Sequence, residues 1–129
     1  MKKIAVVLLA LVVGACAYKH EPIYNVDDPV PPSAQALPAD KIGKAITESA
    51  QVLRWTVENA GPGHLVATQS QPKMSATVDI YYTQTSWRIV YKTSTGLRAE
   101  DGHIHDHYNL WIRNLEQEIK VHLNNVGVN

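Results

Sequence analysis

The chain has a single cysteine, no phenylalanine and no apolar run long enough to cross a membrane. One thiol excludes an intramolecular disulfide and a metal site built from several thiolates. The longest apolar stretch, residues 4–15, covers about 18 Å as a helix, against a hydrocarbon core of about 30 Å. Acidic and basic side chains number 12 each. The chain therefore lacks the basic excess typical of nucleic-acid binding.

Residues 1–15 have the composition of an export signal. Two lysines at positions 2 and 3 precede the apolar run, and small residues lie before the cysteine. The letters VGAC, ending at Cys16, resemble the lipobox of bacterial lipoproteins, in which the signal is cut before a cysteine that carries acyl chains. The resemblance implies a lipid anchor at Cys16. Because Ala17 follows instead of Asp, it also implies the outer membrane, on its periplasmic face. The alternative is an ordinary secretory signal with a chance cysteine.

The segment after the signal is rich in proline. Residues 17–38 contain five prolines, no glycine and no apolar periodicity. This composition predicts a semi-rigid extended spacer, so residues 16–38 are expected to form a lipidated cysteine and a tether. At about 3.1 Å per residue it could hold a domain up to about 70 Å from the lipid. The alternative is that residues 23–24 or 30–32 dock on a partner or back on the domain.

Residues 39–129 are expected to form one α+β domain. Apolar residues recur at helical spacing near its start and end. In the region between these two segments, apolar and polar residues alternate. The predicted elements are a helix over 39–52, strands over 53–58, 64–70, 74–82 and 87–91, and a helix over 104–124.

The hydrophobic pattern also predicts strand register, because a slip of one residue would move every apolar side chain to the wrong face. The hairpin pairs that satisfy this rule are Tyr82–Trp87, Gln69–Met74 and Val57–Leu65. The expected fold is a two-layer sandwich, a four-stranded antiparallel meander with the N- and C-terminal helices on one face, in the order α-β-β-β-β-α.

The other face of this sheet would carry Tyr81, Arg88 and Lys92. Antiparallel sheets can face water on one side, so a solvated surface is the plainer interpretation. The alternative is a docking face for an envelope protein or for peptidoglycan.

The stretch GHIHDH is the one cluster that suggests a metal. Imidazole and carboxylate groups are ligands for zinc and copper. If the helix includes His103, this residue and His107 are one turn apart with Asp106 between them, and the three form a candidate site. If residues 103–105 are extended, His103 and His105 share a side that excludes His107. The plainer interpretation is that an aspartate caps the helix and the histidines are polar residues of its first turn.

The C-terminal pattern IHxxYNxWIxxL starts at Ile104, after IYY at 80–82 and WRIVY at 87–91. This set resembles a family of small, uncharacterised lipoproteins of Gram-negative bacteria. The resemblance implies a fold and a location but no reaction. Within the pattern, His105 and Asn109 are one turn apart and off the core stripe, so they are expected to brace the loop near residues 94–97 or to line a ligand site.

No nucleophile elbow, phosphate-binding loop or HExxH motif is present, so no catalytic residue and no cofactor are assigned. The expected function is that of a lipid-anchored, non-enzymatic binding or accessory protein of the cell envelope. Its expected partners are the membrane, through the N-terminal lipid, and an envelope protein or peptidoglycan. The alternative is a periplasmic metal-binding lipoprotein that uses the histidines from 103 to 107. An envelope hydrolase is the least favoured possibility.

Overall fold

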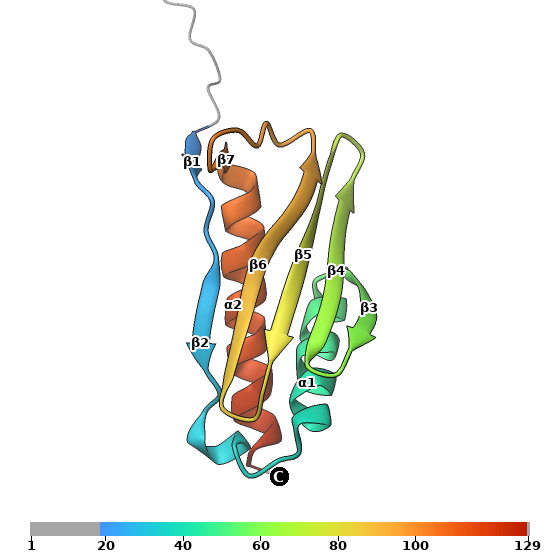
Figure 1. The fold of residues 1–129 in the computed structure, drawn as a ribbon, viewed down its shortest axis with the longest axis vertical. Helices are drawn as coiled ribbons and strands as arrows, with labels where there is room; N and C mark the ends of the chain where they lie inside the picture. Colours follow the sequence, from blue (N-terminus) through green and yellow to red (C-terminus); the bar gives the residue numbers. More distant parts are fainter. Residues whose placement is uncertain (1–18, 129) are drawn as a thin grey trace, which may run out of the picture.

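The computed structural model describes residues 19–128, which form an antiparallel sheet with two helices on one face (Figure 1). The main sheet has the strand order β2-β6-β5-β4-β3, and β1 pairs with β7 in a separate two-stranded sheet. The predicted α+β fold is confirmed, with β2 as a fifth strand. The elements are β1 (His20–Pro22), β2 (Val26–Pro29), the 3-10 helix η1 (Pro32–Ala34), α1 (Ala39–Val52), β3 (Thr56–Gly61), β4 (His64–Gln71), β5 (Met74–Tyr82), β6 (Ser86–Thr95), β7 (His103–His105) and α2 (Asp106–Val126).

Helix α1 has the predicted bounds, and its apolar stripe is buried. Ile42, Ile46 and Ala50 are fully buried, as helical spacing requires. The helix ends where Arg54 takes a positive φ of 66°. Residues 53–55 therefore turn the chain, and β3 begins at Thr56 instead of at the predicted residue 53.

Helix α2 supplies the longest buried stripe of the core. It begins at Asp106, two residues after the predicted start, because Ile104 remains extended in β7 and lies opposite Glu21 of β1. Neither helix in the described part of the chain is both long and apolar enough to span a bilayer. The fully buried residues of the stripe are Tyr108, Ile112, Leu115, Ile119 and Leu123.

The residues on the inner face of the sheet were predicted correctly. Of the three predicted hairpin registers, one is confirmed and two are wrong. Tyr82 lies opposite Trp87, as expected. In the β4–β5 hairpin, Met74 pairs with Gln71 and not with Gln69, because the chain turns over two residues instead of four.

The β3–β4 pairing is also displaced by two residues, since Val57 lies opposite Ala67 and not Leu65. A shift of two residues keeps every side chain on its predicted face. The assignment of residues to the two faces therefore survives both errors.

The prediction that residues 17–38 form an extended spacer is wrong for the described part of that segment. From residue 20 onward it runs along the side of the domain (Figure 1). There β1 pairs with β7, and β2 pairs with the edge of β6. Val26, Val30 and Ala34 are buried in the core. The alternative expectation, docking back on the domain, describes the observed arrangement, and the prolines suit an edge strand that needs few backbone donors.

Asn109 of α2 holds the beginning of this N-terminal segment. Its side-chain oxygen accepts the backbone N–H of Tyr24 at 3.0 Å, and its side-chain nitrogen donates to the carbonyl of Pro22 at 2.9 Å. The first backbone N–H of α2, from Asp106, donates to the carbonyl of Lys19 at 2.9 Å. The N-terminal segment thus satisfies a helix-end donor that would otherwise need a cap.

A cluster of charged groups joins β2 to the middle of α2. The Tyr24 hydroxyl donates to Glu116 at 2.7 Å, and Lys120 Nζ lies 3.6 Å from Asp28 Oδ2. The Arg113 guanidinium lies 5.0 Å from the centre of the Tyr24 ring. These contacts fix β2 against the helix along its outer side.

The pKa values of the Asp28 and Glu116 carboxyl groups are shifted in opposite directions. Burial, followed by a hydrogen bond to Glu116, raises the pKa of Asp28 to about 6. Burial alone would raise the pKa of Glu116, but hydrogen bonds from Asp28 and Tyr24, together with the charge of Lys120, hold it below its ordinary value. The two acids therefore favour a state in which Asp28 keeps a proton and Glu116 is ionised.

Replacing Asn109 by Ala is expected to destabilise the fold by about 1–3 kcal/mol, because two partly buried backbone groups lose their partners. Denaturant unfolding measures the loss, and amide exchange at Tyr24 should accelerate. Asn114→Ala, at an exposed position of the same helix, is the matched control and should change stability by less than about 0.5 kcal/mol. Equal effects of the two substitutions would contradict the assigned role of Asn109.

Asp28→Asn is expected to stabilise the protein above pH 6 by about 1–3 kcal/mol. The raised pKa means that ionising Asp28 costs stability as pH rises from about 4 through about 6, and asparagine avoids this cost. The gain should shrink toward pH 4 and vanish at lower pH, where Asp28 is protonated in both the folded and the unfolded state. Thermal unfolding across this pH range measures it. Asp27→Asn, at an exposed neighbouring position, is the matched control and should not reproduce this gain.

Candidate functional site

The predicted docking residues lie together on the sheet face that no helix covers. Tyr81 of β5 stacks on His64 of β4, with ring centres 4.5 Å apart and planes 18° apart. From the strand on the other side, the Arg88 guanidinium lies 5.0 Å from the centre of the Tyr81 ring. The ring is therefore flanked by an imidazole and a guanidinium from its two neighbouring strands.

Asp79 links this row to the third predicted residue, Lys92. One carboxylate oxygen of Asp79 lies 2.7 Å from His64 Nε2 and 3.7 Å from Lys92 Nζ. Asp79 is largely buried while Lys92 and Arg88 are exposed. On the central strands β4–β6 the exposed charges are therefore cationic, whereas the outer strands add the exposed acids Asp27, opposite Arg88, and Glu58, opposite Val66, to the same face.

A hollow of about 280 Å³ opens at one end of this row. Its lining combines the two β5 tyrosines with Arg88 and the turns beside them. Gly63 belongs to this lining. Its φ of +70° and the nearby carbonyl of Tyr82 leave no room for a Cβ, which accounts for glycine at this position. The full lining is Pro62, Gly63, Tyr81, Tyr82, Thr83, Ser86 and Arg88.

The His64–Asp79 pair resembles the acid–base half of a hydrolase site, but its surroundings do not complete one. The imidazole lies flat against Tyr81, and the described residues place no hydroxyl donor on the second ring nitrogen of His64. Nucleophilic catalysis would need that donor within hydrogen-bond reach of the base.

Four of the six histidines gather at the end of the molecule where β1, β7 and the start of α2 meet (Figure 1). We refer to His20, His103, His105 and His107 as the histidine end. His103 does not approach His107 as predicted. Its ring stacks on His20 at 5.4 Å, and its Nδ1 lies 3.0 Å from the carbonyl of Asp101. The predicted set of His103, Asp106 and His107 is wrong because residues 103–105 are extended.

The structure instead brings His105, Asp106 and His107 together. Each offers one ligand atom, and these atoms lie within 4.8 Å of one another. His105 also caps α2, since its Nδ1 accepts the backbone N–H of His107 at 2.9 Å. That nitrogen lies 3.0 Å from Asp106 Oδ1. Zinc bonds of about 2.0–2.1 Å would require these side chains to close further, and His105 would have to use Nε2 or give up its capping bond.

His105 and Asn109 do not form a common ligand site. Asn109 is buried under residues 22–24, whereas His105 faces the histidine end. The expected bracing of the loop near residue 97 occurs through the backbone, where the His105 N–H donates to the Leu97 carbonyl at 2.9 Å. Asn109 braces the N-terminal segment instead.

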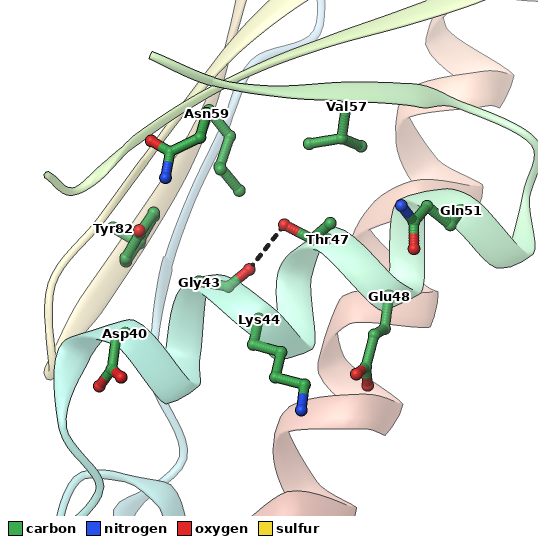
Figure 2. A pocket seen from close by; sticks show the side chains of 10 residues that line it. Asp40, Gly43, Lys44, Thr47, Glu48, Gln51, Val57, Asn59 and Tyr82 are labelled. Carbon is green, nitrogen blue, oxygen red and sulfur yellow. Dashed lines mark hydrogen bonds between the residues drawn. The ribbon is translucent and has the colours of Figure 1, made fainter. Parts of the chain in front are cut away.

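A groove of about 490 Å³, larger than the hollow beside Tyr81, lies between α1 and the sheet, and it was not among the sites predicted from the sequence (Figure 2). One wall is the polar side of α1, and the other includes Val57, Leu65 and Tyr82. Gly43 allows this approach, because a Cβ there would collide with the Tyr82 hydroxyl group. A glycine within a helical pattern was the available signal. The helix residues along the groove are Asp40, Gly43, Lys44, Thr47, Glu48 and Gln51.

Two core side chains carry buried polar atoms without a hydrogen-bond partner in the described structure. They are Trp87 Nε1 and the Tyr108 hydroxyl group. Burial, and then the charge of Tyr91, raise the pKa of Tyr108 above its ordinary value. Both rings belong to the core, so their polar atoms do not add a group to any of the three surfaces above.

The predicted lipidation site, Cys16, lies outside the described residues.

Comparisons with known proteins found no family model, no curated protein and no solved structure that matches the chain.

Proposed function

We propose that this chain is a lipid-anchored, non-enzymatic binding protein of the cell envelope, held at Cys16 on the periplasmic face of the outer membrane. It contacts an envelope protein through the uncovered sheet face. The observation that carries the proposal is the row His64–Tyr81–Arg88 with the hollow beside it. The lipobox-like sequence supports the anchor.

The chemistry of the central strands β4–β6 on this face favours a partner that presents carboxylates. On these strands Arg88 and Lys92 are the exposed charged groups, and the acid between them and His64 is largely buried. The exposed acids of the same face, Asp27 and Glu58, lie on the outer strands β2 and β3. The Tyr81 ring is flanked on both sides, so it offers its edge and not an open face for stacking. An acidic protein surface fits this arrangement, because arginine pairs well with carboxylates at interfaces.

Photo-crosslinking in intact cells tests this proposal. A photoreactive residue at position 90, between the two cations, should give a discrete protein adduct, whereas one at exposed position 51 of α1 should not. Arg88→Gln with Lys92→Gln should reduce the adduct at least about fivefold, or about 1 kcal/mol. Lys41→Gln with Lys44→Gln is the matched control and should retain it. No adduct at position 90, or an equal effect of both pairs, would overturn the proposal, as would co-sedimentation of the purified chain with peptidoglycan alone.

Metal binding is the second candidate function, and the convergence of His105, Asp106 and His107 favours it. Titration calorimetry with zinc and copper should show binding tighter than about 10 µM, equivalent to about 7 kcal/mol. His107→Ala should abolish binding. His103→Ala, in the same cluster but turned toward His20, should leave it unchanged. Weaker binding by the parent chain, or equal losses in both variants, would exclude this site.

A further inference from the structure

The position of the first described residues restricts how the domain can sit on a membrane. Three peptide units separate Cys16 from Lys19, and at about 3.6 Å each they span at most about 11 Å. Under the proposed lipid anchor, on which this inference rests, Lys19 must therefore lie within that distance of the lipidated residue. The reach of about 70 Å estimated for a free spacer does not apply.

Residues 19–24 are part of the folded domain and cannot lengthen this reach. The Lys19 carbonyl accepts the first N–H of α2, and the Ile23 N–H donates to the Gly102 carbonyl at 2.9 Å. Asn109 bonds both Pro22 and Tyr24. In addition, β1 pairs along its whole length with β7. The beginning of β1 is thus fixed beside the N-terminal end of α2 (Figure 1).

We infer that the histidine end, with the loop over residues 96–102, is the surface of this protein that lies against phospholipid headgroups. Its exposed side chains include Lys19, Arg98 and three of the four histidines. Cationic and imidazole N–H groups are suited to phosphate oxygens. The exposed acids Glu100 and Asp101 offset the cations. Charge alone therefore gives little attraction, and the acyl chains hold the surface in place.

The same geometry places the candidate docking face away from the lipid. Helix α2 starts at the histidine end, and its 21 residues span about 32 Å. The β5–β6 turn lies at the opposite end of the sheet (Figure 1). Tyr81 and Arg88 lie next to that turn. The hollow that they line would then open toward the compartment and would be accessible to a partner.

Fluorescence quenching on vesicles tests this orientation. The full lipidated chain is purified from membranes with one added cysteine, either Glu100→Cys near the histidine end or Thr85→Cys in the β5–β6 turn; both positions are exposed. Acylation consumes the thiol of Cys16, so a fluorophore labels only the new residue. Each protein is incorporated into vesicles of phosphatidylethanolamine and phosphatidylglycerol in which some lipids carry a nitroxide on the headgroup. The fluorophore at position 100 should lose most of its emission, and the one at position 85 should lose almost none.

Equal quenching at the two positions, or stronger quenching at 85, on vesicles that carry the protein would overturn the orientation while leaving the anchor intact. Inserting ten glycine and serine residues after Ala17 is the matched control for distance, and it should remove the difference between the two positions. Mass spectrometry of Cys16 and flotation of the vesicles, with Cys16→Ser as the negative control, test the anchor itself. Absence of both an acyl adduct and flotation would overturn the anchor and the orientation together.

Discussion

The amide group of Asn109 connects residues 22–24 to the first turn of α2, and the arrangement of the N-terminal segment depends on it. One side chain satisfies a backbone acceptor at the end of β1 and a backbone donor just beyond it. With that segment fixed, β2 completes the edge of β6, and Val26 and Val30 enter the core. Asn109 therefore acts as a structural residue whose effect extends to the sheet edge and to the position of Lys19.

The parts of the fold that the sequence could predict are those determined by local periodicity. The α1 stripe through Ile42 and Ile46 and the alternating residues of β5 both have a clear period, and both elements occur as predicted. Register was predictable where both strands carry bulky apolar residues, as for Ile80 and Ile89. It was wrong where small and polar residues such as Ala67 and Gln69 allow a shift of two positions at no cost in burial.

The docked N-terminal segment could not be predicted from local patterns. Its buried residues Val26, Val30 and Ala34 are separated by polar residues and prolines, so they match neither the helix nor the strand period. The contacts that hold it join residues 85 to 92 positions apart, as between Tyr24 and Glu116. Proline content alone could not separate a solvated spacer from an edge strand, because both tolerate missing backbone donors.

For the candidate sites, the sequence could predict which residues share a face of the sheet. It could not predict which side chains come together in a cluster. Alternation placed Tyr81, Arg88 and Lys92 on one surface, and the structure shows the contacts that connect them. At the histidine end, the starting residue of α2 decides which side chains meet. A difference of two residues in that start replaces His103 by His105 in the cluster.

The pairing of the first strands with the last elements also has a consequence for the order of folding. Residues 20–29 are made before the rest of the folded domain, yet their partners in β6, β7 and α2 are made last. Closing such a long loop is entropically costly, so contacts of this range generally form late and slow the folding reaction. The hairpins of β3–β6 join residues that are close in sequence and can form first, with the N-terminal segment and the α1–α2 contact joining afterwards. Until then the β6 edge and the side of α2 are uncovered, and an unpaired strand edge of this kind can pair with another chain.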